Sequence, residues 1–315
     1  MRYTPALRNA TILVVVALGA LTLIELRRTD AAPTPATTTT VRSTARSATP
    51  SSPAPYPNET TTGVPADVTL AASNSITVST DGAVIDGQDV SGCITVNAND
   101  VTISRTRVRM TACYGFPGNA ITNNGTNLTV VDTEIDGRKL ADCGQAIGNG
   151  GYTLERVDIH DCSDGPRGGD AGKPVTILDS YIHNLFEQPG DHGDGYQCYA
   201  GRGPSYGSVP TLIRHNRVEG GTNAAVYAAD FCDGPMTLDD NLLSGGGYTI
   251  RLYDQQVTVT NNVVVRGTYT YGPVSTYSGP QPSNPDKGMT SVVWTNNRIA
   301  DNPDGTGLAE AVPPA

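Results

Sequence analysis

The chain has 315 residues, of which only 17% are charged, and its 35 glycines and 22 prolines are typical of a turn-rich β protein. The formal net charge of −10 argues against nucleic-acid binding, which needs a basic face. One sequence repeat covers most of the length, so we expect one repeat domain rather than two globular ones.

Residues 1–32 have the pattern of a targeting segment, because Arg2 and Arg8 precede an apolar run of 14 residues, Thr11–Ile24. The run is shorter than the roughly 20 residues of a full membrane span, and a cleaved signal peptide and a retained anchor both stay open. Residues 33–65 are rich in Thr, Ser and Pro, which predicts a disordered linker. We therefore expect a secreted or cell-surface protein that touches the membrane only through its N-terminal segment.

Residues 66–305 contain a pattern that recurs eight times at intervals of 21 to 36 residues. Its third and eighth positions are apolar, and threonine alternates with branched aliphatics, which favours strand over helix. A second short strand follows most copies, as at Gly195–Tyr199. This order predicts an all-β solenoid of about 8–10 coils with parallel strands ~4.8 Å apart, and residues 306–315 are expected to form a flexible tail. The copies begin at Val101, Leu128, Tyr152, Val175, Thr211, Met236, Val257 and Val292.

Three further positions of the repeat carry polar residues in columns. The sixth position predicts an asparagine stack with hydrogen bonds from coil to coil, at Asn216, Asn241, Asn262 and Asn297. The fifth position alternates in charge, which predicts register-setting pairs worth a few tenths to ~1 kcal/mol each, at Arg105, Asp132, Arg156, Asp179, His215 and Asp240. The ninth position is either a general-base or cation site or a row of turn residues, at Asp136, His160, His183 and Glu219.

Six cysteines in an exported chain predict three disulfides. Cys143 and Cys162 each precede the apolar residue of a second strand by four positions, so they fall in one column of adjacent coils and should pair. Nearness in sequence gives the remaining pairs, Cys93 with Cys113 and Cys198 with Cys232. The sequence contains no Cys-x-x-Cys string, which would have indicated a metal site. No cofactor is predicted, and calcium stays open as a ligand.

The longest interval holds the string His192-Gly-Asp194-Gly-Tyr196-Gln197. A loop of this length is functional or loose, and an Asp-Gly turn that merely begins a strand is the alternative interpretation. Aligning the second strands places one outward residue of successive coils in a row, and such a row suits a sugar chain, with arginine for a carboxylate or sulfate and tyrosine for the apolar sugar face. The predicted substrate-binding residues are Arg167, Gln197, Arg251 and Tyr196, with Tyr227 in the same row.

On its repeat, its asparagine column and its His-x-Asp-Gly-x-Gln string, the chain resembles the exported right-handed parallel β-helix proteins of the pectate-lyase-like superfamily. The resemblance implies a single right-handed parallel β-helix, and it leaves the function open among lyases, hydrolases, epimerases and binding proteins. The Trp-Ile-Asp-His and Arg-x-Pro-x-x-Arg strings of pectate lyases are absent from the sequence, as are the Asn-Thr-Asp and Gly-His-Gly strings of polygalacturonases.

We therefore expect a monomeric extracellular protein that binds a polysaccharide or cell-wall glycan and that, if catalytic, cleaves it by β-elimination. His192, with Asp194 beside it, is the predicted base and Tyr227 the predicted acid, while Arg167 or Arg251 stabilises the developing charge. A non-catalytic glycan-binding module and a structural cell-surface spacer are the alternatives. The binding module needs only the row of arginine and aromatic residues. The spacer predicts that these rows lie on a flat, solvent-exposed surface without a groove.

Overall fold

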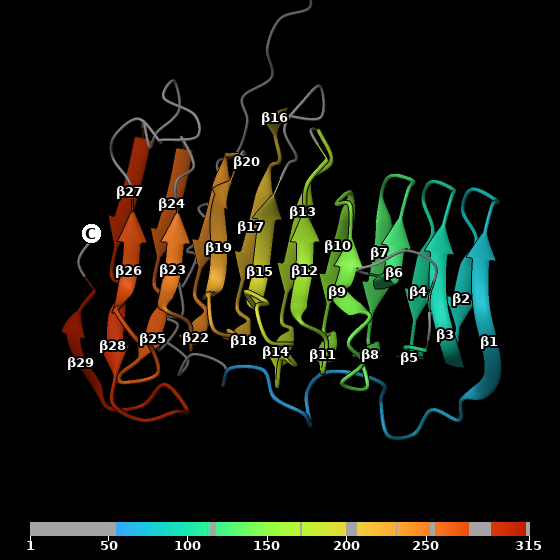
Figure 1. Ribbon diagram of the computed structural model, residues 1–315, viewed down its shortest axis with the longest axis horizontal. Helices are drawn as coiled ribbons and strands as arrows, with labels where there is room; N and C mark the ends of the chain where they lie inside the picture. The colour runs from blue at the N-terminus through green and yellow to red at the C-terminus, as the bar shows by residue number, and fades with distance from the viewer. Residues whose placement is uncertain are drawn as a thin grey trace, which may run out of the picture. The chain divides into compact units, whose positions relative to one another are not determined.

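A computed structural model describes most of the chain beyond the N-terminal segment, and every element in the described part is a β-strand (Figure 1). Among these residues, no helix is long and apolar enough to span a membrane. The predicted targeting segment and most of the predicted linker lie outside the described residues, which are 55–111, 113, 118–170, 172–199, 207–230, 232–252, 256–276 and 291–312.

The first strand of each repeat forms a nine-stranded sheet in which all pairs are parallel. One strand per coil gives nine coils in the described chain, within the predicted range. The sheet consists of β2 (Val84–Asp86), β4 (Thr102–Ser104), β7 (Leu128–Val131), β10 (Tyr152–Glu155), β13 (Val175–Leu178), β17 (Thr211–Arg214), β21 (Met236–Asp239), β24 (Gln256–Thr260) and β27 (Ser291–Thr295).

An 18-stranded sheet contains two further rows of parallel strands, which share the long strand β3 (Gln88–Val96). The second row follows the first within each coil, as β5 (Arg107–Arg109), β8 (Glu134–Asp136), β11 (Asp158–His160), β14 (Tyr181–His183), β18 (Arg217–Glu219), β22 (Leu242–Ser244), β25 (Val263–Val265) and β28 (Arg298–Ala300). The third row is β1 (Ala71–Val78), β6 (Gly118–Asn123), β9 (Cys143–Gly148), β12 (Asp164–Gly168), β15 (Asp194–Tyr199), β19 (Ala224–Asp230), β23 (Tyr248–Leu252) and β26 (Gly272–Thr276).

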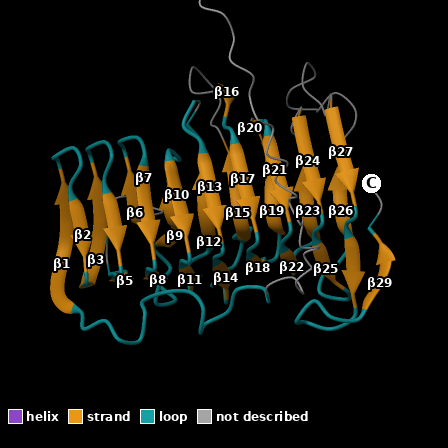
Figure 2. Ribbon diagram, turned by 180° about the vertical axis from the view of Figure 1, so that it is seen from behind, coloured by secondary structure: helices purple, strands orange, loops and turns teal. Residues whose placement is uncertain are grey.

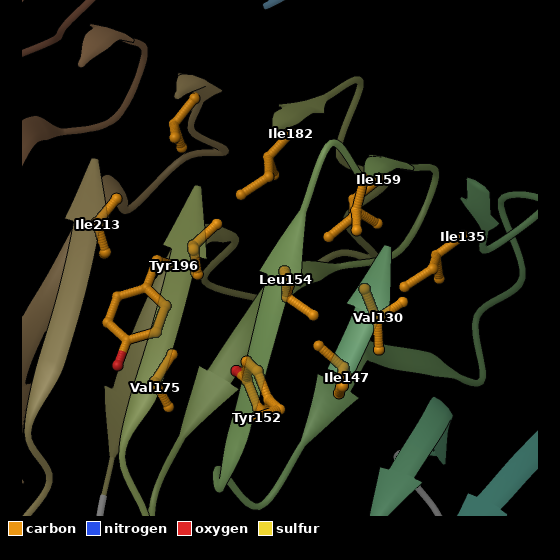
Figure 3. Packing of buried hydrophobic residues seen from close by; sticks show 14 of the residues in the cluster. Val130, Ile135, Ile147, Tyr152, Leu154, Ile159, Val175, Ile182, Tyr196 and Ile213 are labelled. Carbon is orange, nitrogen blue, oxygen red and sulfur yellow. The ribbon is translucent and has the colours of Figure 1, made fainter. Parts of the chain in front are cut away.

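The register of the strands confirms the repeat. Residues at the third position pair from coil to coil, as Leu154 does with Val130 and Ile177, and all three are buried. Figure 3 shows Leu154 and Val130 in the packed interior. Residues at the eighth position do the same, as Ile159 does with Ile135. Sequence alignment missed one copy that precedes the others, in which Ile85 and Val90 occupy these two core positions.

The predicted asparagine stack is present and buried. The side-chain amide of Asn241 donates to Asn262 Oδ1 at 2.8 Å, and that of Asn216 donates to Asn241 Oδ1 at 3.1 Å. Asn262 continues the stack to Asn297 at 2.9 Å, and Ser180 occupies the same column one coil before Asn216. Each side chain also bonds backbone groups at the bend between the first and second strands, so the column satisfies polar groups that lie inside the coils.

Two of the predicted charge pairs at the fifth position form, at a turn and not within the strand, while Arg105 pairs instead with Asp86, which is outside the column. Arg156 Nε donates to Asp132 Oδ1 at 2.6 Å, and His215 Nδ1 lies 2.6 Å from Asp179 Oδ1. All six residues of this row have a left-handed backbone, with φ between 44° and 53°. This conformation is costly for residues other than glycine, so the row marks the tight turn that separates the first strand from the second.

Two of the predicted disulfides are present among the described side chains. Cys143 and Cys162 lie on adjacent coils with Cα atoms 4.9 Å apart, as their common column requires, and Cys93 pairs with Cys113 at 6.1 Å. Cys198 is also disulfide-bonded, while the side chain of Cys232, its predicted partner, lies outside the described ones. Cross-links of this kind fit an oxidising compartment.

The chain ahead of β1 packs against the coils. Residues 55–70, here called the strap, run along one edge of the coils toward β1, as the teal chain below the strands shows (Figure 2). The Tyr56 hydroxyl lies 3.5 Å from Asp240 Oδ1, and the Gly63 amide donates to the Arg156 carbonyl at 3.0 Å. The predicted linker extended to residue 65, so the composition misassigned its last part, which is ordered by contacts along the fifth-position turns.

Residues 306–312 pack against the last coil, which corrects that part of the predicted flexible tail, and residues 313–315 lie outside the described residues. Strand β29 (Leu308–Ala311) pairs antiparallel with β28. The Trp294 ring nitrogen donates to the Val312 carbonyl at 2.7 Å, and Val312 is buried. An antiparallel strand on the last coil covers part of an edge that would otherwise be open to pairing with another chain.

Candidate functional site

A groove with a volume of about 630 Å³ opens over the third row of strands. Its floor comes from β9, β12, β15, β19 and β23, which lie side by side (Figure 1). Five of the seven predicted site residues line this groove, namely Arg167, His192, Gln197, Tyr227 and Arg251.

The predicted row of outward residues is in register. Arg167 on β12 pairs with Gln197 on β15, Gln197 with Tyr227 on β19, and Tyr227 with Arg251 on β23. The residues alternate along each strand, so the neighbours of Gln197 on both sides, Tyr196 and Cys198, are fully buried. The row therefore faces the groove because the opposite face of each strand carries the core.

Both arginines of the row are held against tyrosine rings. The guanidinium carbon of Arg167 lies 4.9 Å from the ring centroid of Tyr199, and that of Arg251 lies 5.1 Å from the ring centroid of Tyr227. Arg251 also donates from Nη1 to Asn223 Oδ1. Stacking fixes each guanidinium plane and leaves its hydrogen-bonding edge oriented for an anionic or polyhydroxyl ligand.

The loop between β14 and β15 supplies one wall of the groove and is fastened by two carboxylates. Glu187 accepts hydrogen bonds from the backbone amides of Thr222, at 2.7 Å, and Gly193, at 3.0 Å. Asp191 accepts one from the Ser163 hydroxyl at 3.1 Å. These bonds fix the loop to the coils on either side. His192 lies between two bonded residues, Asp191 and Gly193, and is exposed on the groove wall.

Two buried carboxyl groups, those of Asp164 and Asp194, lie on the adjacent strands β12 and β15. Asp164 is 8% exposed and lines the groove, and its Oδ1 accepts a hydrogen bond from the backbone amide of Asp194 at 2.9 Å. Desolvation by burial raises the pKa of Asp164 to about 6, although the hydrogen bonds from Asp194 and Gln145 and the charge of Arg167 oppose the shift. An aspartic acid with this pKa exchanges protons close to neutral pH, as a general acid or base must.

Asp194 is fully buried and does not line the groove, which corrects its predicted place beside His192 as a catalytic group. Burial first, and the charge of Asp164 second, raise its pKa well above the ordinary value. Its carboxyl group accepts hydrogen bonds from Asn223 Nδ2 at 2.9 Å and from Gln197 Nε2 at 3.2 Å. Asp194 therefore orients two amides that do line the groove.

The prediction that Tyr196 binds substrate is wrong. Its side chain is 0% exposed and lies among core residues, where its hydroxyl is 3.1 Å from Thr211 Oγ1 (Figure 3). Strand alternation explains the error, since Tyr196 is adjacent to Gln197 and must point to the opposite face.

Among the polar residues of the groove that sequence reasoning missed are Asp164, Asp191, Tyr199 and Asn223. The signal for Asp164 was available, because it precedes Arg167 by three residues, just as Asp194 precedes Gln197. Tyr199 is two residues beyond Gln197 and so lies on the same outward face. The other two lie in loops, where no periodic pattern predicts orientation.

The ninth-position column lies on the second row of strands and does not line the groove. His160 pairs in register with Asp136 on one side and with His183 on the other, and the two imidazole rings have centroids 5.3 Å apart. His183 lies 2.9 Å from Asp158 through Nε2 and accepts from Asn184 Nδ2 at Nδ1. Within this column, Asp136, His160 and the adjacent Asp161 are close enough together to hold a metal ion.

Comparison of the chain with models of protein families, with curated proteins and with solved structures finds no match.

Proposed function

We propose that the protein is a right-handed parallel β-helix of the pectate-lyase-like type that binds an acidic polysaccharide outside the cell and cleaves it. The in-register row Arg167, Gln197, Tyr227 and Arg251 along one groove is the observation that carries this proposal. Parallel crossover connections are right-handed in nearly all proteins, which supports the handedness. The disulfides support an extracellular location, with the domain acting as a monomer.

The dimensions of the row suit an extended sugar chain. Three steps between adjacent strands at about 4.8 Å span ~14 Å, enough for roughly three sugar units. Arg167 and Arg251 lie at the two ends of this row, so each would meet a carboxylate or sulfate on a different sugar. Tyr199 and Tyr227 support the arginines, and because Tyr227 is only 8% exposed, Tyr199 is the ring that offers surface to the apolar face of a sugar.

The chemistry that fits these side chains is β-elimination next to a uronate carboxylate. A base takes the proton from the carbon beside the carboxylate, a double bond forms, and the bond to the glycosidic oxygen breaks as that oxygen takes a proton. His192, exposed on the groove wall, is the base. Tyr227, the acid expected from the sequence, and Asp164, whose raised pKa of about 6 leaves a fraction of it protonated near neutral pH, are two proton donors that line the groove.

Hydrolysis is the second candidate, favoured by the presence of Asp164 and Asp191 in the same groove. A protonated carboxyl that assists the leaving group and an ionised one that activates water are the two groups that an inverting glycoside hydrolase needs. Binding without cleavage is the third candidate, since the arginine and tyrosine row alone is sufficient for it.

One screen separates these functions. The secreted form is incubated with a panel of uronate polymers and with matched neutral polymers. We measure the ultraviolet absorbance of unsaturated products, the release of reducing ends and, by calorimetry, binding. Both product signals together identify the lyase, and reducing ends alone identify the hydrolase. Binding without products identifies a glycan-binding module, and the absence of all three signals with every polymer rejects the proposal.

Replacing Arg167 or Arg251 by alanine should weaken the binding of an acidic glycan by about 10-fold or more at low salt, because each arginine supplies a charge-assisted hydrogen bond. The loss should shrink as ionic strength rises, since added salt screens the interaction in the parent protein. Arg266, which pairs with Asp301 and Glu310 away from the groove, gives the matched control Arg266→Ala, for which we expect unchanged affinity. Equal losses in all three variants would contradict the assignment of the row.

A further inference from the structure

A compact set of nitrogen and oxygen donors lies at the ends of β8 and β11, outside the groove. His160 Nδ1 is 3.1 Å from Asp161 Oδ2 and 3.8 Å from Asp136 Oδ1, and the donor atoms of the three residues all lie within 4.8 Å of one another. Asp136 belongs to one coil, and the other two residues belong to the next. The set therefore bridges two adjacent coils.

These separations match the coordination shell of a small divalent ion. Zinc binds histidine nitrogen and carboxylate oxygen at about 2.0–2.2 Å, and a tetrahedral arrangement then places neighbouring ligand atoms about 3.4 Å apart. The two distances from His160 Nδ1, 3.1 Å and 3.8 Å, lie on either side of this value. The oxygens of Asp136 and Asp161 lie within 4.8 Å of each other, and each of the three side chains is 19% exposed, which leaves the fourth position accessible to water.

The surroundings complete the pattern of a metal-bound histidine. The second ring nitrogen of His160, Nε2, faces Glu134 Oε1 at 3.7 Å, and Glu134 is itself fixed by Arg107 Nε at 2.9 Å. A carboxylate on the non-ligating nitrogen is the usual outer partner of a histidine that binds a metal, because it fixes the orientation of the ring.

The carboxylates of Asp136 and Asp161 also give this cluster a negative charge that would attract a cation. Among the described residues, the only ion-pair partner of Asp136 and of Asp161 is His160. Glu134 also faces this imidazole, but Arg107 compensates its charge. The fifth-position row is different, since Arg156 there compensates Asp132 directly.

We propose that Asp136, His160 and Asp161 bind one zinc ion or a similar divalent transition-metal ion, with water as the fourth ligand. The ion ties the coil of β8 to the coil of β11, the same two coils that the Cys143–Cys162 disulfide joins. Calcium fits this donor set poorly, because it takes six to eight oxygen ligands and the set includes an imidazole nitrogen. The site is independent of the glycan-binding groove and of its chemistry.

The test uses the untagged secreted protein, stripped with a chelator and titrated with zinc chloride in a calorimeter. The parent should bind one zinc ion, and zinc should raise its thermal unfolding midpoint. His160→Ala and the near-isosteric Asp136→Asn should each weaken zinc binding by more than about 100-fold, and Glu134→Gln by about 10-fold. His215→Ala removes a histidine that contacts an aspartate elsewhere, Asp179, and should bind zinc like the parent.

Three outcomes would overturn the site. These are a parent protein that binds zinc no tighter than about 1 mM, an Asp136→Asn variant that binds it as tightly as the parent, and a His215→Ala variant that loses binding to the same extent as His160→Ala. Asp136→Asn keeps the shape of the side chain, so it remains informative even where His160→Ala fails to fold. Calcium chloride titrated in the same way should give no saturable binding to these residues.

Discussion

Asp164→Asn should produce a protein that is more stable at pH 7 and that no longer turns over polysaccharide. The pKa of Asp164 is about 6 in the folded protein, compared with about 3.9 for an unfolded aspartate. Between these values the folded state binds more protons than the unfolded state, so the free energy of unfolding falls as pH rises through this window. The ionised carboxylate thus costs about 3 kcal/mol at pH 7, and asparagine removes that cost.

Denaturant unfolding at two pH values tests the stability half of this prediction. At pH 7 the variant should gain about 2–3 kcal/mol over the parent. At pH 3.5, where Asp164 is protonated in both states, the difference should vanish. The asparagine carbonyl can still accept the hydrogen bond from the Asp194 amide, so little is lost elsewhere. A variant that is less stable than the parent at pH 7 would show that the ionised carboxylate is stabilised by its neighbours.

The same substitution should lower kcat by at least about 100-fold, the usual contribution of a positioned acid or base, while KM changes little. In the parent, activity that depends on protonated Asp164 should decline as pH rises through about 6. Asp170→Asn changes a half-buried aspartate that pairs with Lys173 and does not line the groove, so its kcat should equal that of the parent. Undiminished turnover by Asp164→Asn would leave Tyr227 as the acid.

The coils were predictable from the sequence because each one repeats the same physical requirement. An apolar side chain must face the interior at the third and eighth positions of each copy, and the intervals fix which residues pair. Val101, Leu128 and Tyr152 accordingly fall in register with one another and with the later copies. Once this register is known, the alignment of Arg167 with Gln197 follows by counting along each second strand.

The residues that sequence reasoning misplaced either lie outside the repeat or were assigned without regard to its strand alternation. Tyr196 was assigned to the groove by its chemical type, although strand alternation places it inside. The strap was assigned to the linker by composition alone, which cannot show that Tyr56 has a complementary surface on a coil far along the chain. Asp191 and Asn223 lie in loops whose course depends on contacts such as those of Glu187.

The asparagine stack joins successive coils by buried hydrogen bonds, and Asn241 occupies an inner position in it. Its amide donates to Asn262 Oδ1 at 2.8 Å and to the carbonyls of Ile213 and Asp239 at 2.9 and 3.0 Å. Its Oδ1 accepts from the Asn216 backbone at 2.9 Å. Asn241→Ala would leave several buried groups without partners, each at a cost of about 1–3 kcal/mol.

We therefore expect Asn241→Ala to lower the free energy of unfolding by about 4 kcal/mol, measured by chemical denaturation. Asn241→Ser should cost less, because Ser180 shows that a hydroxyl serves in the same column by accepting from the Val157 amide at 3.0 Å. Asn124 is the matched control, since it also bonds a stacked asparagine but is exposed, and Asn124→Ala should cost under about 1 kcal/mol. If Asn241→Ala and Asn124→Ala lower the free energy of unfolding by the same amount, burial does not strengthen these hydrogen bonds. The stack would then set the spacing of the coils without stabilising them.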